Sequence, residues 1–146
     1  MNRLICFRGR RFVKVALALC TTTALLPCAL MAKKFAMKSA SIVPAASGEV
    51  KTSKDKNGNT IFVLEVKNLA KPGALTPPRT TYMVWIQPKG GAPESQGILK
   101  VNDKLEGRFQ SSTQDNDFDL WITAENDDMA KSPSGAEVLR ANGVGR

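Results

Sequence analysis

The sequence of 146 residues contains no histidine, and its three cysteines, Cys6, Cys20 and Cys28, all lie near the N-terminus. Histidine is the usual general base at neutral pH, and histidine and cysteine are the commonest ligands of zinc and copper. These absences argue against an enzyme, and we predict a noncatalytic protein without a cofactor or metal centre. Because the later residues hold no thiol, we expect a fold stabilised by packing without disulfide bonds.

Acidic side chains are also missing from the N-terminal region, and this accounts for most of the formal net charge of +8. Residues 1–32 carry five basic side chains and no acidic one, which leaves a net charge of +3 for residues 33–146. A small excess of charge spread over a whole domain produces a weak field for phosphate groups. We therefore expect no nucleic-acid partner.

The apolar residues 15–26 follow a basic start and precede Pro27 and a region of small residues. This three-part order is typical of an export signal, so we predict a hydrophobic, helical signal peptide over residues 1–32. The alternative is an uncleaved membrane anchor, since residues 13–32 have roughly the 20 residues that cross a bilayer. In both cases the folded domain lies outside the cytoplasm, and we expect a periplasmic or secreted location.

Three segments have the residue pattern of strands. Residues 81–87 are rich in β-branched, aromatic and large apolar side chains, which is typical of a central strand. Residues 60–69 and 117–125 alternate between apolar and polar side chains, as half-buried strands do. Because side chains alternate between the faces of a strand, we expect one face of each segment to form the core. The predicted core residues are Phe62, Leu64, Val66, Tyr82, Val84, Ile86, Phe118, Leu120 and Ile122.

Turn residues separate these segments and indicate the fold class. Asn57 and Gly58 supply the positive φ angles that a tight hairpin needs. We expect about seven short strands and no sustained helical period. The sequence therefore predicts an all-β fold over residues 48–142, an antiparallel β-sandwich of immunoglobulin-like or fibronectin-like size, with a small closed barrel as the alternative. Residues 33–47 are predicted to be a flexible tether and residues 143–146 a tail.

Two tryptophans lie on the strand faces that point away from the predicted core. Trp85 and Trp121 share this position with Met83. If the two strands are neighbours, these side chains meet on the outer face of the sheet. An exposed apolar patch often marks a surface for a partner or ligand, so Met83, Trp85 and Trp121 form the predicted partner surface. The alternative is that other parts of the chain cover them.

The acidic side chains of residues 115–119 superficially resemble the start of a calcium loop, but the required glycine and bidentate acid are missing from its later positions. We interpret Asp117 and Asp119 as the solvated face of a strand. A weak calcium contact shared with residues 125–128 is the alternative. An enzyme that uses carboxylates such as Asp117 and Glu125 would need the two acids in one cleft.

Several segments, taken in order, resemble the extracytoplasmic C-terminal domain of the anti-sigma-K factor family. They are residues 64–69, 81–86, 97–99, 122–125 and 133–139. The most specific feature is Tyr82 and Trp85, three residues apart in one strand. The resemblance covers residues 48–142 and implies a β-sandwich outside the membrane. In the family this domain is attached through a transmembrane helix to a cytoplasmic module that holds a sigma factor inactive.

This chain departs from the family pattern at its N-terminus. The 32 residues before the exported part are too few for the cytoplasmic module, so we do not carry over the regulation of a sigma factor. We predict an exported noncatalytic module that binds or senses an unidentified protein or other component of the cell envelope. It would contact the membrane only through an uncleaved N-terminal segment. The alternatives are a structural or accessory envelope protein without a discrete ligand, and a membrane-anchored remnant of an anti-sigma factor.

Overall fold

The computed structural model describes residues 32–145. The predicted signal peptide and the alternative membrane anchor therefore lie outside the described residues, except for Ala32. Within residues 32–145, no helix is long and apolar enough to span a membrane. The helical structure in this range is a 3-10 turn, η1, at Pro72–Ala74.

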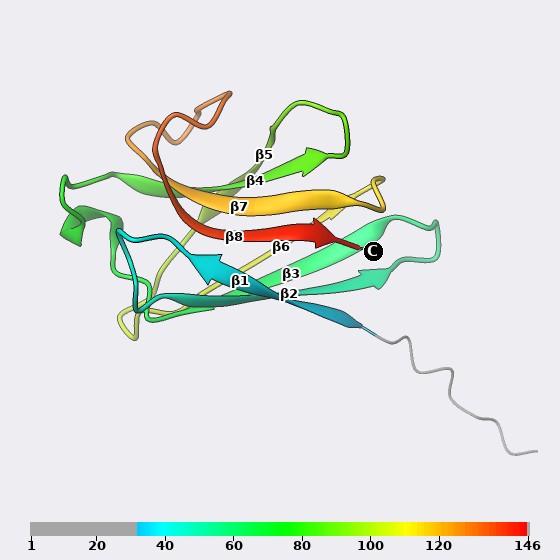
Figure 1. Ribbon diagram of the computed structural model, residues 1–146, viewed down its shortest axis with the longest axis horizontal. Helices are drawn as coiled ribbons and strands as arrows, with labels where there is room; N and C mark the ends of the chain where they lie inside the picture. The colour runs from blue at the N-terminus through cyan, green and yellow to red at the C-terminus, as the bar shows by residue number, and fades with distance from the viewer. Residues whose placement is uncertain (1–31, 146) are drawn as a thin grey trace, which may run out of the picture.

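Strands make up the rest of the regular structure, which confirms the prediction of an all-β fold. They are β1 (Lys33–Ser39), β2 (Ser47–Lys54), β3 (Thr60–Lys67), β4 (Thr81–Pro88), β5 (Glu94–Leu99), β6 (Gly107–Thr113), β7 (Phe118–Glu125) and β8 (Ala136–Val144). All neighbours are antiparallel and belong to one sheet with the order β5-β4-β7-β8-β1-β2-β3-β6 (Figure 1).

The hairpin of β2 and β3 forms where the turn residues and the alternation predict it. Gly58 has a φ angle of 85° in the connection between the two strands, which an L-residue with a side chain rarely adopts. In β3 every second residue from Thr60 to Val66 is buried, and the residues between them are half-buried. The pattern with a period of two therefore places one face of this hairpin in the core.

β4 and β7, the two tryptophan-bearing strands, are neighbours and pair along their whole length. Val84 lies opposite Ile122, and Trp85 lies directly opposite Trp121. Each of the nine predicted core residues has at most 1% of its surface exposed. Phe62 of β3 and Phe118 of β7 pack with ring centroids 5.7 Å apart and connect these two strands across the core. Burying side chains of this size stabilises the fold by roughly 1.5–3 kcal/mol each.

The prediction of a flexible tether over residues 33–47 is wrong for β1. This strand pairs with β2 through Lys33–Met37 and then with β8 through Lys38 and Ser39. Met37, and Val43 and Ala46 in the following connection, are buried in the core. The three lysines of β1 hid its alternation, because lysine carries little strand propensity while only Phe35 and Met37 point inward.

The sheet is nearly closed on itself. The two edge strands, β5 and β6, follow each other in the chain and are not paired in a ladder. An isolated bridge joins Val101, in the connection between them, to Gly107 at the start of β6. Between the two strands, the Ser111 hydroxyl donates to Gln96 Oε1 over 2.9 Å. A Cβ atom on Gly97 would lie 3.4 Å from the ring of Phe109, so the ring packs directly against the β5 backbone.

The C-terminal boundary also differs from the prediction. Residues 143–146 were expected to form a tail, but β8 continues through Val144, whose side chain is fully buried. Gly143 stays in the strand because its N–H donates to Asp119 Oδ1 over 2.8 Å. The ordered domain therefore has eight strands and begins and ends outside the predicted limits of 48–142.

Because successive strands alternate in direction, their connections gather at two opposite ends of the molecule (Figure 1). We call the end that carries residues 40–46, 68–80, 100–106 and 126–135 the loop end. The other end carries residues 55–59, 89–93 and 114–117, and we call it the turn end. Lys33, the first residue of β1, lies at the turn end.

Candidate functional site

The predicted partner surface of Met83, Trp85 and Trp121 is not exposed. These side chains retain 2%, 0% and 3% of their exposed surface, so the prediction of an exposed patch is wrong. They form a second apolar cluster, separate from the main core, on the outer face of β4 and β7. Ala130 from the connection between β7 and β8 packs on this cluster, and the Arg140 guanidinium lies 4.5 Å from the ring centroid of Trp121.

A chain of hydrogen bonds fastens residues 126–135 over this cluster. Trp85 Nε1 donates to Thr123 Oγ1 over 2.8 Å, and the Thr123 hydroxyl donates to Glu125 Oε1 over 2.6 Å. The backbone N–H and the hydroxyl of Ser134 also donate to the Glu125 carboxylate, over 3.1 and 2.8 Å. Glu125 is 1% exposed, so its carboxylate closes the base of the connection from inside the protein.

These bonds decide the charge state of Glu125. Burial alone would raise the pKa of its carboxyl, but the hydrogen bonds from Thr123, Ser134 and the Gly135 backbone lower it, and the pKa ends below the ordinary value. Glu125 is therefore an ionised acceptor with its donors in place. This arrangement fits a structural role, because the hydrogen-bonding capacity of the carboxylate is already used.

The two acids considered for catalysis do not share a cleft. Asp117 precedes the first residue of β7 and Glu125 is its last, so they lie roughly 25 Å apart along the strand. Asp117 faces Lys89 at the turn end, with 4.0 Å between Oδ2 and Nζ. Within residues 32–145, no group of three or more acidic, histidine or cysteine side chains has the arrangement of a metal site.

Exposed apolar side chains gather instead at the loop end. Among the described residues, the large apolar side chains with high exposure are Ile42, Ile98, Leu105 and Met129. Three of them lie in three different connections of the loop end, and Ile98 is the next-to-last residue of β5 on the same side. Met129 is the extreme case, with 79% of its surface exposed. The turn end carries none of these side chains, so the exposed apolar surface is confined to one end.

The loop end also holds unusual backbone conformations. Asn68 and Leu105 have φ angles of 54° and 61°, and they are the two non-glycine residues with positive φ among the described residues. They are close together, because the N–H of Leu69 donates to the Leu105 carbonyl over 3.0 Å. Asparagine tolerates this conformation, but leucine pays an energetic cost in it. Such residues often cluster at functional sites, where surrounding contacts hold them in place.

Further contacts hold the connections of the loop end together. The Tyr82 hydroxyl donates to the Ala70 carbonyl over 2.7 Å, and Lys71 pairs with Asp103 over 2.6 Å. Thr80 donates its N–H to the Glu125 carbonyl over 3.0 Å. These bonds connect residues 68–80 to β4, to residues 100–106 and to β7. The loop end is therefore a preformed surface built from several connections.

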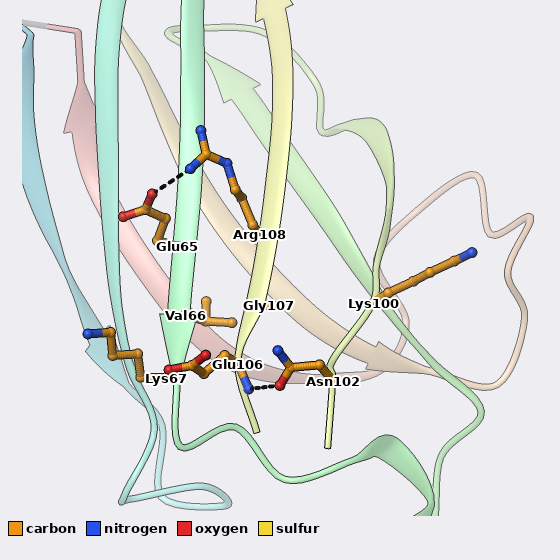
Figure 2. Close-up of a pocket in the computed structure, with 8 residues that line it drawn as sticks. All are labelled: Glu65, Val66, Lys67, Lys100, Asn102, Glu106, Gly107 and Arg108. Carbon is orange, nitrogen blue, oxygen red and sulfur yellow. Dashed lines mark hydrogen bonds and ion pairs between the residues drawn. The ribbon is translucent and has the colours of Figure 1, made fainter. Parts of the chain in front are cut away.

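A hollow of about 330 Å³ at this end lies between the last residues of β3 and the first residues of β6. We call it the charged hollow. Figure 2 shows Glu65 paired with Arg108, while Lys67 and Lys100 point to opposite sides. Glu65 also accepts from Lys51 over 2.6 Å, which lowers the pKa of its carboxyl. The charged side chains that line the charged hollow do not converge on one point, so the hollow offers no focused site for a charged ligand.

Two smaller hollows have an uncharged lining apart from one arginine. A hollow of about 300 Å³ lies between residues 40–46 and 68–76, and a more enclosed one of about 70 Å³ lies beside it. Both are lined by Ile42, Leu75 and Thr76, so they adjoin each other. We call these two adjoining hollows together the apolar groove. Its lining can bury apolar side chains of a partner.

Neither a family model nor a curated protein matches this chain. The resemblance to the anti-sigma-K factor family consequently stays a prediction from the residues. No residue role is transferred from another protein to the surface described above.

The sequence did not reveal the loop end as a candidate site. Ile42, Leu105 and Met129 lie in polar or proline-containing connections, far apart in the chain. Ile42 and Met129 lie outside any strand pattern, whereas Leu105 fits the start of a predicted strand over residues 105–111. Their proximity at one end depends on the strand order, which the sequence did not predict.

Proposed function

We propose that this protein is an exported, noncatalytic β-sandwich domain that binds a protein of the cell envelope through its loop end. The observation that carries the proposal is the confinement of the exposed large apolar side chains to that end. Exposed large apolar side chains that gather on one end of a domain favour a site for another protein there. The preformed connections lower the entropy that binding would cost.

The proposal of a sandwich, immunoglobulin-like or fibronectin-like in its general form, is supported by β1 in the middle of the sheet and by the two edge strands. β1 pairs with β2 at its start and with β8 at its end, so it passes from one half of the sheet to the other. β5 and β6 form no ladder, and the one bridge near them joins Val101 of their connection to Gly107. Both features favour two facing halves over a closed barrel.

The proposed location follows from the predicted signal and is compatible with the position of β1. Lys33 lies at the turn end, so a membrane anchor that precedes it would join the domain at that end. The loop end would then point away from the membrane. The proposed absence of catalysis is supported by a sequence without histidine and by carboxylates that lie far apart or are engaged in hydrogen bonds.

Site-specific photocrosslinking in the envelope of the producing cell tests this proposal. A photoreactive residue is placed at Ile42, Leu105 or Met129 of the loop end, and at the exposed Lys56 or Lys89 of the turn end as matched controls. We expect a specific crosslinked product from the loop-end positions and none from the controls. The crosslinked protein is then identified by mass spectrometry, purified and titrated against the domain.

Products from the turn end alone would contradict the proposed surface. A domain that is exported but yields no product at any position would favour the alternative of a structural envelope protein without a discrete ligand. An N-terminus that stays cytoplasmic with the domain would contradict export itself.

A further inference from the structure

Arg79 is the only charged residue that lines the apolar groove. Its side chain is half-buried in the smaller hollow, beside Ile42, Leu75 and Pro77. Among residues 32–145 it makes no side-chain hydrogen bond or ion pair, whereas Lys71 in the same connection pairs with Asp103. A guanidinium in apolar surroundings without an anion is an unused recognition group, since arginine can donate two parallel hydrogen bonds to a carboxylate.

The backbone holds Arg79 in position. Its own N–H donates to the Pro72 carbonyl over 3.0 Å, and the N–H of Thr80 donates to the Glu125 carbonyl over 3.0 Å. The two prolines before it, Pro77 and Pro78, further restrict the chain. Arg79 is therefore placed at the groove by the fold, so little order has to be gained on binding.

The shape of the groove indicates what it can accept. The larger hollow is open and apolar, and residues 40–46 and 68–76 form its sides. The smaller hollow is more enclosed, and Ala124 and Ala136, where β7 ends and β8 begins, form its wall. Its volume of about 70 Å³ suits one small apolar side chain. A chain laid along the groove would reach this wall beside Arg79.

We propose that the apolar groove binds the C-terminal end of a partner polypeptide, with its terminal carboxylate on Arg79, its last small side chain in the smaller hollow and the preceding apolar residues over the larger hollow. This inference rests on the proposed function and names the chemistry of the partner. The positive charge of Arg79 favours a carboxylate as its partner. The wall next to Arg79 would block the path of a longer chain, so it favours the end of a polypeptide over an internal segment. The shallow, open larger hollow suits a peptide on the surface better than an acyl chain, which needs a deep cavity.

Fluorescence anisotropy with the domain that begins near Lys33 tests the inference. The probe is a library of short, fluorescein-labelled peptides with small apolar residues at the last positions and a free C-terminus. The same peptides with an amidated C-terminus form the second arm, and amidated peptides with an internal aspartate form the third. Decanoate is included as a competitor to test for an acyl ligand.

We expect saturable binding of free-acid peptides and about tenfold or greater weakening on amidation, the range for loss of a charged hydrogen-bonded pair. Arg79→Gln should weaken the free acids by a similar factor and leave the amides unchanged. Lys104→Gln is the matched control, because it removes a charge from an exposed position of the same end. Arg79→Gln breaks no ion pair within the described residues, so its thermal unfolding should match that of the unaltered domain.

Equal binding of acids and amides, or equal binding of the internal aspartate peptides, would overturn the terminal carboxylate on Arg79. Binding of decanoate without binding of any peptide would overturn the peptide as occupant. If no peptide binds while Ile42, Leu105 and Met129 still crosslink to a partner, the groove inference fails and the proposed function stands. If crosslinking also fails, both are overturned.

Discussion

The two ends of the molecule use different residue types where the backbone has a positive φ angle. At the turn end, the positive φ angles occur at glycines, with 85° at Gly58 and 79° at Gly90. At the loop end, they occur at Asn68 and Leu105. A Cβ atom at Gly58 or Gly90 would meet nothing within 4 Å, so glycine is present there for backbone freedom alone.

This difference indicates that the residues of the turn end serve only the fold, whereas those of the loop end also serve another function. Glycine adopts the left-handed backbone conformation without steric cost, and it occupies the tight turns of the turn end at Gly58 and Gly90. Leu105 adopts this conformation at a cost and exposes 40% of its surface. A large apolar side chain held in this way contributes little to the core, which is why we assign the loop end to binding.

The largest effect is expected where each end fastens a connection with a carboxylate. Glu125→Ala at the loop end should lower the free energy of unfolding by about 3 kcal/mol, because buried donors lose a charged acceptor. Asp55 at the turn end accepts three hydrogen bonds from Asn57 and Asn59 but is more exposed, so Asp55→Ala should cost clearly less. Urea unfolding followed by tryptophan fluorescence measures both. Equal losses would show that burial does not separate the two ends.

The same carboxylate predicts a pH dependence. The pKa of Glu125 is lower in the folded protein, so its stabilising contribution is present above the ordinary glutamate pKa and is lost as the pH falls through the folded value. Glu125→Gln should therefore lose less stability than the unaltered protein between neutral and strongly acidic pH. The difference between the two urea midpoints across pH isolates Glu125 from the other acids. Parallel curves would contradict the ionised state of this side chain.

A substitution at Gly58 tests the treatment of the turn end. Gly58→Ala should lower the free energy of unfolding by about 1 kcal/mol, because alanine is strained at positive φ while its methyl group meets no neighbour. Thermal unfolding measures the change, and Lys56→Ala in the same turn serves as the control. An unchanged free energy of unfolding for Gly58→Ala would contradict the conclusion that glycine is needed there for its positive φ angle.

Tyr82 tests how firmly the loop end is attached to the core. Burial raises the pKa of its phenol to about 12, and it is the single tyrosine of the sequence. Absorbance at the tyrosinate band should therefore appear near that pH or on alkaline unfolding. The stability linked to the neutral phenol is present below the ordinary tyrosine pKa and is lost as the pH rises through the raised value. Tyr82→Phe should cost about 1 kcal/mol, because the Ala70 carbonyl loses its donor. Ionisation near pH 10 in the folded protein would contradict this attachment.

The smallest effect on stability is expected at Leu105. Leu105→Gly removes the cost of a left-handed leucine but adds the entropy of glycine and loses some packing, so the free energy of unfolding should change by less than about 0.5 kcal/mol. Crosslinking from Met129 to the partner should nevertheless decrease. A loss of stability well above this range, with crosslinking retained, would show that Leu105 serves the fold and that the two ends do not differ in the proposed way.

Local patterns predicted the strands whose side chains alternate cleanly. The turn at Gly58 and the buried face of β3 follow from turn chemistry and from a period of two. The same period places Trp85 and Trp121 away from the core, whereas their direct pairing depends on β4 and β7 being neighbours. The same reasoning missed β1, because lysines occupy most of its outward positions and only Met37 is buried in it. It also ended the domain before Val144, since Asn142-Gly143 looks like a turn until Asp119 bonds to Gly143.

The prediction of an exposed tryptophan surface failed for a non-local reason. Alternation correctly placed Trp85 and Trp121 away from the main core, but a strand pattern contains no information about what lies above the sheet. The covering residues 126–135 read as a polar loop, and their position depends on the buried bonds between Glu125 and Ser134. These bonds exist only once β7 and β8 are paired.

By itself, the amino-acid sequence determined that residues 32–145 are built from strands and contain no cysteine or histidine, because composition and a period of two act locally. Only the tertiary structure decided that the tryptophans are covered and that Ile42, Leu105 and Met129 share one end. The reason is the order of the strands across the sheet, which brings distant connections together through backbone pairing that no single segment encodes.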